Sequence, residues 1–237
     1  MLTYLIFVAP ALVLSLWAQA KVKSTYAKYS QIATYSGMTG AQVADRILRD
    51  SNIALVDDPE RYPGGSACGL EAIPGELTDH YDPRSRTLRL SQDIYHGNSI
   101  AALGIAAHEV GHAIQHAKLY APLMLRNVVY PVCNIGSTLA WPLLIIGFIL
   151  NSFQLVLLGV ALFSLAVVFT VLTLPVEFDA SRRAVLALSQ GGYLQEDELR
   201  GAKKVLNAAA LTYVAAAAMA IMQLLYYALP LLLGNRN

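Results

Sequence analysis

The charged side chains of this chain are distributed very unevenly, and this limits the folds it can adopt more than any other feature. Three stretches contain no Asp, Glu, Lys, Arg or His, and they comprise 20, 50 and 31 residues: Met1–Ala20, Asn127–Val176 and Val205–Asn235. One helical crossing of a bilayer takes about 20 apolar residues. The first and third stretches each fit one crossing, whereas the second fits two crossings with a turn at Asn151 and Ser152. The sequence therefore predicts four transmembrane helices, over residues 1–20, 127–150, 153–176 and 205–233.

The first of these stretches has a second interpretation, which is a cleaved signal peptide. Ala18-Gln19-Ala20 has the small-residue pattern of a cleavage site. However, signal peptides usually begin with a positively charged region, and no Lys or Arg precedes this apolar run. We therefore expect a transmembrane helix.

The rest of the chain has the composition of a soluble domain. Residues 21–126 and 177–204 hold all 16 acidic residues and 16 of the 17 Lys and Arg residues. About a quarter of their positions are charged, as in ordinary soluble domains. We expect a mainly α-helical integral membrane protein that carries one small α+β domain with a minimal sheet, built from these two segments. The net charge of +1 gives no reason to expect nucleic acid as a partner.

The distribution of Lys and Arg also predicts the topology. With four crossings, the two polar segments lie on one side of the membrane, and Arg236 is the only basic residue on the other side. Cytoplasmic segments carry the excess of Lys and Arg in membrane proteins. We therefore expect a multi-pass protein of the cell membrane whose polar domain is cytoplasmic and whose two termini lie outside.

Local patterns predict the elements of the polar domain. Thr39 and Gln42 have the spacing of a capping box, which predicts a helix over residues 40–51. Alternating apolar residues predict strands over 53–56, 77–81 and 86–90, the last two as a hairpin, and Pro and Gly predict a loop over 62–69. Further helices are predicted from residue 98 or 99 to 120, over 177–188 and from 196. The first membrane helix is expected to continue through Lys21–Tyr35.

The strongest motif is the HExxH sequence formed by His108-Glu109-Val110-Gly111-His112, in a predicted helix. Four residues turn an α-helix by about 400°, so the two imidazoles leave the same face, about 6 Å apart along the axis. They can then share one zinc ion, and Glu109 can reach a zinc-bound water as a general base.

A catalytic zinc ion needs a third protein ligand. His116 is eight residues from His108, about 12 Å along a straight helix. This is too far for zinc bonds of about 2 Å, so we expect His116 to support a ligand or to lie at the rim of the site. Glu177 is the better choice, because it is the first charge after 50 uncharged residues and a carboxylate there is costly unless paired or metal-bound. The alternative is an acid at a helix N-terminus after Pro175, favoured by the helix dipole.

Four segments resemble one family when they are taken together: TDHYDPRSRTLRLS (78–91), SIAALGIAAHEVGHAIQH (99–116), LPVEFDASRRA (174–184) and GAKKVLNAAALTYVAAA (201–217). The chain resembles the YugP-like membrane zinc metallopeptidases, also called neutral zinc metallopeptidases, over nearly its whole length. The resemblance implies that His108 and His112 hold zinc and that Glu109 is catalytic. By analogy with membrane gluzincins such as the CAAX prenyl protease type, it implies a zincin-like domain with Glu177 as the third ligand.

The same analogy raises a question about the residues that support the ligands. In those relatives an Asp four residues after the ligand Glu supports a zinc histidine, and here that position is Ser181. Asp179 lies two residues after Glu177 and is expected to point elsewhere on the helix. Support for the histidines therefore stays open at the level of sequence.

Two further side chains and one strand have alternative interpretations. His80, near Asp79 and Asp82, would stabilise an oxyanion or contact substrate, but a hairpin histidine satisfied by its neighbours is the favoured interpretation. Arg182 would stabilise an oxyanion or contact anionic lipid, or would simply flank a membrane helix on its cytoplasmic side. The strand over 86–90 is expected to be an open edge that receives an extended peptide.

Together these features predict a zinc-dependent metalloendopeptidase that cleaves peptide bonds near the cytoplasmic membrane surface. In this mechanism Zn²⁺ polarises the carbonyl, and Glu109 takes a proton from water and passes it to the leaving amine. The expected partners are the lipid bilayer and a protein or peptide substrate associated with it, and no oligomeric state is predicted. The alternative is a non-catalytic, zinc-stapled membrane scaffold that binds partner proteins and does not need Glu109. A transporter ranks last, because the predicted spans contain no ionisable residues.

Overall fold

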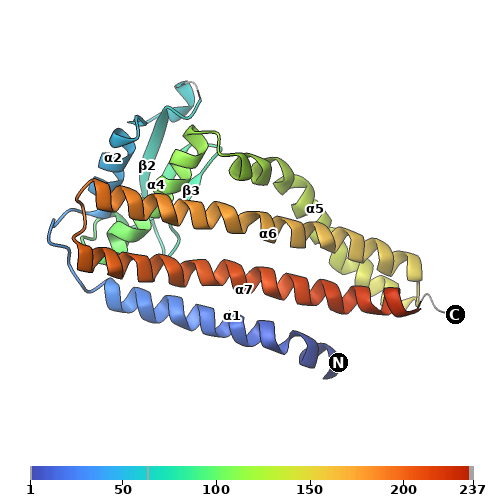
Figure 1. Cartoon of the computed structure of the whole chain (residues 1–237). Helices are drawn as coiled ribbons and strands as arrows, with labels where there is room; N and C mark the ends of the chain where they lie inside the picture. The colour runs from blue at the N-terminus through green and yellow to red at the C-terminus, as the bar shows by residue number, and fades with distance from the viewer. Residues whose placement is uncertain (1, 63, 235–237) are drawn as a thin grey trace. The chain divides into compact units, whose positions relative to one another are not determined.

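The computed structural model describes residues 2–62 and 64–234, and Figure 1 shows their elements. These residues form two compact units, which we call the helical unit and the polar unit. The helical unit takes the described residues of Met1–Gln19, Met124–Pro175 and Leu211–Asn237. The polar unit takes those of Ala20–Leu123 and Val176–Ala210. Every residue predicted for the metal site therefore belongs to the polar unit.

Four long helices dominate the chain: α1 (Leu2–Tyr29), α5 (Ala121–Ile149), α6 (Phe153–Gln190) and α7 (Glu196–Gly234). Each contains a segment that is long and apolar enough to cross a membrane. This confirms the mainly helical fold class, and among the described residues there are four candidate membrane-spanning helices, the number predicted from the uncharged stretches. Arg236, on which part of the predicted topology depends, lies outside the described residues.

The helix α1 ends earlier than predicted. It was expected to continue to Tyr35, but it ends at Tyr29. Beyond that point the Thr34 backbone N–H donates to the Asn98 carbonyl at 2.9 Å, and the Thr34 hydroxyl donates to the same oxygen at 3.0 Å. These bonds to a distant segment replace the local bonds of a helix, and the sequence pattern around residues 21–35 does not reveal them.

The polar unit contains three shorter helices, α2 (Gly40–Asp50), α3 (Gln92–Tyr95) and α4 (Ile100–Ala117), and the 3₁₀ turn η1 (Pro59–Arg61). The capping box predicted at α2 is present, because Thr39 Oγ1 accepts from the Gln42 N–H at 3.2 Å and Gln42 Oε1 accepts from the Thr39 N–H at 3.0 Å. The buried faces of α2 and α4 and of the sheet form one apolar core, which includes Val43, Ile47, Leu48, Leu88, Leu90 and Leu103.

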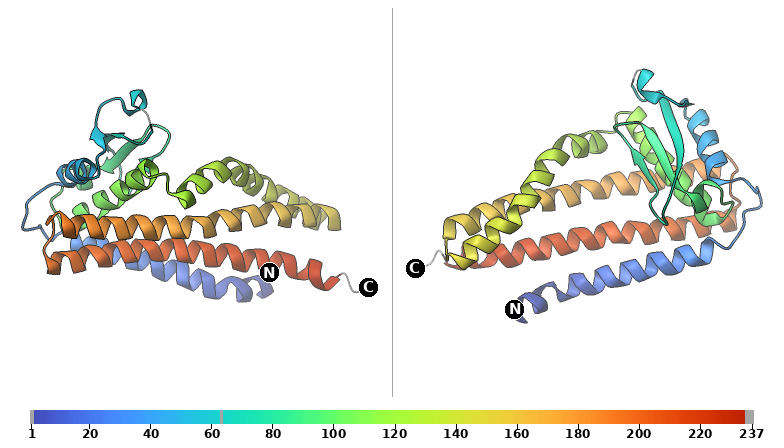
Figure 2. Two further views of the ribbon diagram at one scale, coloured as in Figure 1. Left: turned by 45° about the horizontal axis from the view of Figure 1, so that its top comes forward. Right: turned by 180° about the vertical axis from the view of Figure 1, so that it is seen from behind.

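A four-stranded sheet completes the polar unit, with strands β1 (Ala54–Leu55), β2 (Ala67–Ile73), β3 (His80–Asp82) and β4 (Thr87–Ser91) in the order β1-β2-β4-β3. β2 is parallel to both β1 and β4, whereas β3 is antiparallel to β4. Figure 2 shows the strands next to α4. The prediction that residues 86–90 form an open edge is wrong, because β4 pairs on both sides and β3 is the outer strand.

The strand β2 begins inside the segment that was predicted as a loop. The Pro and Gly content of residues 62–69 predicted a loop, but Gly69 lies in a strand between two partners, next to the buried Ala67 and Cys68. A Cβ atom at Gly69 would lie 2.9 Å from Thr87 Oγ1 on β4. The glycine therefore allows close approach of two strands rather than a turn.

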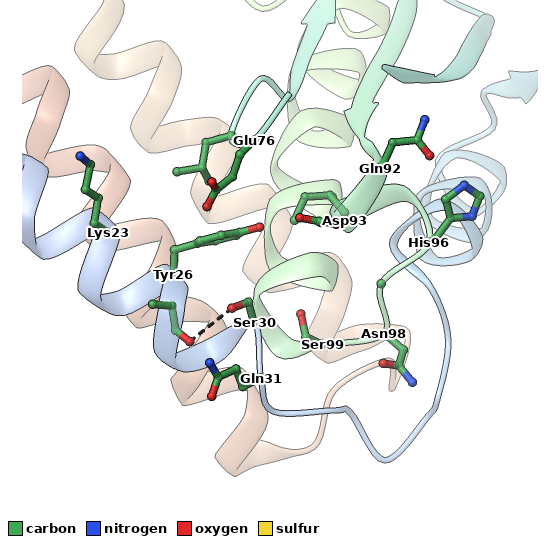
Figure 3. Close-up of a pocket in the computed structure, with 14 residues that line it drawn as sticks. Lys23, Tyr26, Ser30, Gln31, Glu76, Gln92, Asp93, His96, Asn98 and Ser99 are labelled. Atoms are coloured by element: carbon green, nitrogen blue, oxygen red, sulfur yellow. Dashed lines mark hydrogen bonds between the residues drawn. The ribbon is translucent and has the colours of Figure 1, made fainter. Parts of the chain in front are cut away.

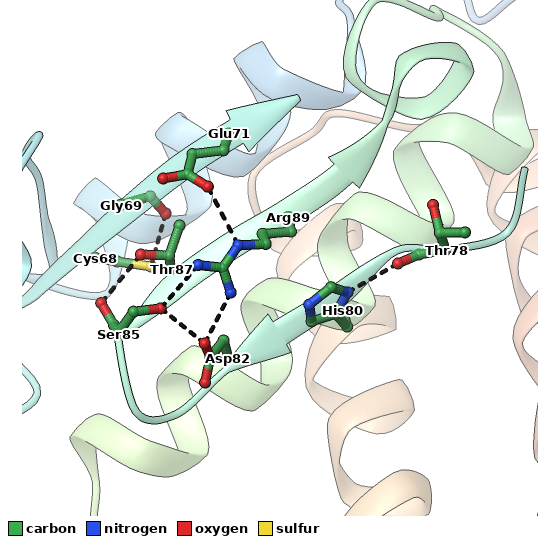
Figure 4. Close-up of polar contacts among 9 residues, drawn as sticks. All are labelled: Cys68, Gly69, Glu71, Thr78, His80, Asp82, Ser85, Thr87 and Arg89. Carbon is green, nitrogen blue, oxygen red and sulfur yellow. Dashed lines mark hydrogen bonds and ion pairs between the residues drawn. The ribbon is translucent and has the colours of Figure 1, made fainter. Parts of the chain in front are cut away.

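A polar network on Arg89 holds β3 against the rest of the sheet (Figure 4). Its guanidinium contacts Asp82 Oδ2 on β3 at 2.8 Å and Glu71 Oε2 on β2 at 3.2 Å, so it bridges three strands. Burial works against ionisation of Asp82, but the hydrogen bonds from Arg89, the Arg84 N–H and Ser85, together with the charge of Arg89, outweigh it and lower the pKa of this carboxyl to about 2. The outer strand is thereby held in a defined position beside α4.

Candidate metal centre

The helix α4 places His108 and His112 on one side of a buried helix. Ser99 Oγ accepts from the Ala102 N–H at 3.1 Å and caps the helix, as the sequence predicted. The two imidazole rings have centroids 4.8 Å apart. Their side chains are 13% and 11% exposed, so both rings are largely removed from solvent.

The carboxylate of Glu177 reaches both histidines from α6. Glu177 Oε2 lies 3.3 Å from His108 Nε2 and 3.5 Å from His112 Nε2. The ligand atoms of the three residues all lie within 4.8 Å of one another. α6 begins at Phe153, so Glu177 lies deep inside a continuous helix. The alternative interpretation of Glu177 as an acid at a helix N-terminus is therefore wrong.

A glycine in the HExxH sequence allows this approach. An added Cβ at Gly111 would lie 2.6 Å from the backbone oxygen of Ala180 on α6 and 3.1 Å from its carbonyl carbon. Real Cβ atoms do not come so close to backbone, so the two helices pack at this distance only with glycine here. The backbone contact between Gly111 and Ala180 brings the histidine helix within reach of Glu177.

The donor set fits a zinc ion. Zinc binds imidazole nitrogen and carboxylate oxygen at about 2.0–2.2 Å, with tetrahedral geometry. Such bonds separate two ligand atoms by roughly 3.3–3.6 Å, and Glu177 Oε2 is 3.3 and 3.5 Å from the two Nε2 atoms. Two imidazoles and one carboxylate also leave the fourth position that a catalytic zinc site keeps for water. The cluster of His108, His112 and Glu177 is therefore a candidate zinc centre.

Each histidine has a polar partner at its other ring nitrogen. Ser181 Oγ lies 3.1 Å from His108 Nδ1, and Gln115 Oε1 lies 3.1 Å from His112 Nδ1. Partners of this kind orient metal-binding imidazoles and select their tautomer. The sequence left open whether Ser181, four residues after Glu177, supports a histidine. In the structure Ser181 contacts His108.

Asp179 supports the site through a residue that the sequence analysis missed. Its Oδ2 accepts from Gln115 Nε2 at 3.0 Å, and its two oxygens also bind Arg182 and Arg183 at 2.6 and 2.5 Å. Asp179 was expected to point away from the residues that support the histidines, but it contacts Gln115, whose Oε1 lies 3.1 Å from His112 Nδ1. The sequence could have indicated Gln115, because it lies three residues after His112 and therefore on the same face of α4.

Glu109 is buried beside the histidines. Burial raises the pKa of Glu109 to about 7, against the influence of His108, and the charge of Glu177 adds to the rise. The backbone N–H of Tyr81 on β3 donates to the Glu109 carboxylate. A carboxyl group with a pKa near neutrality can both accept and return a proton at physiological pH.

The remaining predicted residues lie apart from the three ligand atoms. The His116 Nδ1 atom is 2.7 Å from the Tyr81 hydroxyl, so His116 borders the site through Tyr81. His80 is exposed, and its Nδ1 is 2.8 Å from the Thr78 carbonyl oxygen (Figure 4), as the hairpin interpretation expects. The side chain of Arg182 is 79% exposed, and its ion pair is with Asp179.

The polar unit also contains a groove that is separate from the metal ligands (Figure 3). It has a volume of about 1060 Å³ and lies among the end of α1, the connection before β3 and the connection between α3 and α4. Tyr26, Glu76 and Asp93 are among its lining residues, whereas His108, His112 and Glu177 are not.

The four apolar helices and the metal cluster together are typical of a membrane protein with a candidate zinc peptidase centre. The chain belongs to the family described as "Putative neutral zinc metallopeptidase", whose model matches residues 4–231. It is 48% identical, over 225 residues and 95% of each chain, to a Bacillus subtilis (strain 168) protein described as "Putative membrane protease YugP". No solved structure matches the chain.

Proposed function

We propose that this protein is a membrane-embedded zinc-dependent metalloendopeptidase of the gluzincin type. The observation that carries the proposal is the position of Glu177, whose Oε2 lies 3.3 and 3.5 Å from the Nε2 atoms of the two HExxH histidines. Membership of a family described as zinc metallopeptidases supports the same chemistry.

In the proposed site His108, His112 and Glu177 hold the zinc ion, and Glu109 moves protons. When bound, zinc supplies Lewis-acid polarisation of the peptide carbonyl and makes a water molecule more acidic. Glu109 takes a proton from the attacking water and returns it to the leaving amine. Its burial beside the two histidines, with the Tyr81 N–H directed at the carboxylate, places Glu109 where it can carry out both steps.

We propose that the substrate chain adds to β3 rather than to β4. β3 is the outer strand next to β4, and its Tyr81 N–H is directed at Glu109, so this edge of the sheet faces the proposed general base. An extended peptide that pairs with an outer strand is bound through hydrogen bonds of its main chain, so binding depends little on most of its side chains. This arrangement would bring the scissile carbonyl of a peptide close to Glu109.

We further propose that the site works at the cytoplasmic surface of the cell membrane. Sixteen of the 17 Lys and Arg residues lie in residues 21–126 and 177–204, which favours a cytoplasmic position for these segments and an outside position for both termini. Glu177 directly follows 50 uncharged residues. The bond that is cut would therefore lie near the membrane, in a protein or peptide associated with it.

The test replaces Glu109 by Gln in the full chain, reconstituted in lipid vesicles. We expect Glu109→Gln to retain one zinc ion per chain, measured by elemental analysis, because Glu109 is not a proposed ligand. Cleavage of a peptide mixture, followed through newly formed N-termini, should fall about 10²–10⁴-fold, the usual contribution of a general base. Glu177→Gln should instead lose zinc, and Glu60→Gln, which changes an exposed carboxylate, should change neither readout.

The same experiment distinguishes the alternative function, a zinc-stapled scaffold without catalysis. A scaffold predicts that the wild-type protein binds zinc, releases no new N-termini and is unaffected by Glu109→Gln. A Glu109→Gln protein that holds stoichiometric zinc and cleaves at the wild-type rate would contradict the proposed mechanism.

A further inference from the structure

The amide of Gln115 occupies a fully buried position between α4 and α6. The side chain has no exposed surface. Its Oε1 lies 3.1 Å from His112 Nδ1, and its Nε2 donates to the Val176 carbonyl at 2.8 Å and to Asp179 Oδ2 at 3.0 Å. A glutamine is seldom buried so completely, and here three bonds compensate for the loss of water.

The partners of Gln115 determine which way its amide points. The Val176 carbonyl and the Asp179 carboxylate can only accept hydrogen bonds, so the NH₂ group of Gln115 must face them. The carbonyl oxygen then faces His112, and a hydrogen bond at that position requires a proton on Nδ1. This leaves Nε2 as the ring nitrogen of His112 that faces Glu177, where the distance to Oε2 is 3.5 Å. The tautomer follows from the bonding network as a whole.

We propose that Gln115 is the positioning residue that keeps His112 in its metal-binding tautomer. This inference rests on the proposed function, because it treats His112 as a zinc ligand. In water a neutral histidine favours the other tautomer, in which the proton occupies Nε2 and blocks the metal-binding position. By accepting a hydrogen bond from Nδ1–H, Gln115 favours the tautomer that zinc requires, even in the absence of the metal ion. Its anchors lie on α6, so the same bonds place His112 relative to Glu177.

The two histidines differ in how strictly they are held. His108 Nδ1 has Ser181 Oγ as its partner at 3.1 Å, and a hydroxyl can donate or accept, so Ser181 is compatible with both tautomers. Gln115 is compatible with only one, because its NH₂ group is already committed to Asp179 and Val176. Loss of Gln115 should therefore weaken zinc binding more than loss of Ser181.

The experiment uses the zinc-free full chain in detergent micelles, with ¹⁵N-labelled histidine. Nitrogen chemical shifts should show His112 protonated at Nδ1 in the wild-type protein and mainly at Nε2 in Gln115→Met, which keeps the side-chain length. Zinc affinity, measured by competition with a chelator, should fall about 10–100-fold in Gln115→Met, the usual effect of losing such a partner. The fall in Ser181→Ala should be smaller, and Gln92→Met, at an exposed glutamine, should match the wild type.

A purely structural role for Gln115 predicts a different result. In that case a folded Gln115→Met protein melts earlier but keeps its His112 tautomer and binds zinc within about twofold of the wild type, and the proposal is overturned. If Gln115→Met does not fold, the wild-type spectrum decides, because a His112 without a proton on Nδ1 in the zinc-free protein also overturns it. Neither readout involves cleavage, so this inference and the peptidase function can fail independently.

Discussion

His116 lies on the same helix as the two proposed zinc ligands but contacts a different partner, Tyr81. It lies one turn beyond His112, yet its Nδ1 is 2.7 Å from the Tyr81 hydroxyl on β3. Burial lowers the pKa of His116, and the charge of Arg86 lowers it further. The folded protein therefore holds this imidazole neutral at a pH at which the unfolded chain would protonate it.

We expect this difference to make the protein less stable as the pH falls. Because the folded pKa of His116 is lowered, the unfolded state binds more protons, and stability present above about pH 6.5 is lost as the pH falls towards the folded pKa. The free energy of unfolding of the zinc-free wild-type protein should fall, relative to that of His116→Gln, as the pH is lowered from about 7.5 to about 5. Denaturant unfolding in detergent measures this, and parallel pH curves for the two proteins would contradict it.

Among the elements, the contact between α4 and α6 is the one on which the metal centre depends. Gly111 meets the backbone of Ala180, and the side chains of Gln115 and Ser181 then cross between the same two helices. The HExxH residues lie on one helix and Glu177 on the other. A change in the separation of the two helices therefore changes the distances from Glu177 to both histidines at once.

We expect Gly111→Ala to weaken zinc binding. The new Cβ would meet Ala180 O at 2.6 Å, so the helices must separate, at a cost of about 1–3 kcal/mol. Gly104→Ala on the same helix is the matched control, because its Cβ would lie at an ordinary 3.4 Å from Ala202 Cβ. Chelator competition should show lower zinc affinity only in Gly111→Ala. Equal affinities in both variants would show that the close approach does not control the site.

At the scale of the whole molecule, zinc would join two distant parts of the chain. His108 and His112 come from the segment before the uncharged stretch 127–176, and Glu177 is the first residue after it. Both parts belong to the polar unit. A zinc ion held by all three would therefore add a cross-link inside this unit, in addition to its role in chemistry.

Removal of zinc should loosen the polar unit. A ligand that binds only the folded state raises the free energy of unfolding by about 2.7 kcal/mol when its free concentration is 100 times its dissociation constant. After chelation, we expect faster hydrogen exchange in α4 and in residues 177–190 of α6, with exchange in the helical unit unchanged. Glu177→Gln should show the faster exchange without chelator and respond no further to it. Unchanged exchange in α4 of the wild type would argue against the cross-link.

Much of the fold follows from short-range patterns. The uncharged stretches indicate the four long apolar helices, since a run of about 20 apolar residues has few other stable states. Thr39 and Gln42 mark the start of α2, because a capping box involves only neighbouring residues. The strand β2 was missed at Gly69, where glycine serves close packing against Thr87 on a strand that is distant in sequence.

The sequence by itself determined that His108 and His112 share a helix face, because four residues make just over one helical turn. It also singled out Glu177, because an acid next to a long uncharged run needs a partner. Only the tertiary structure decided which carboxylate meets the histidines and that Gln115, Asp179 and Ser181 support them. The physical reason is that these contacts join α4 to α6 across more than 60 residues of sequence, and local periodicity carries no information about which helices pack together or how closely.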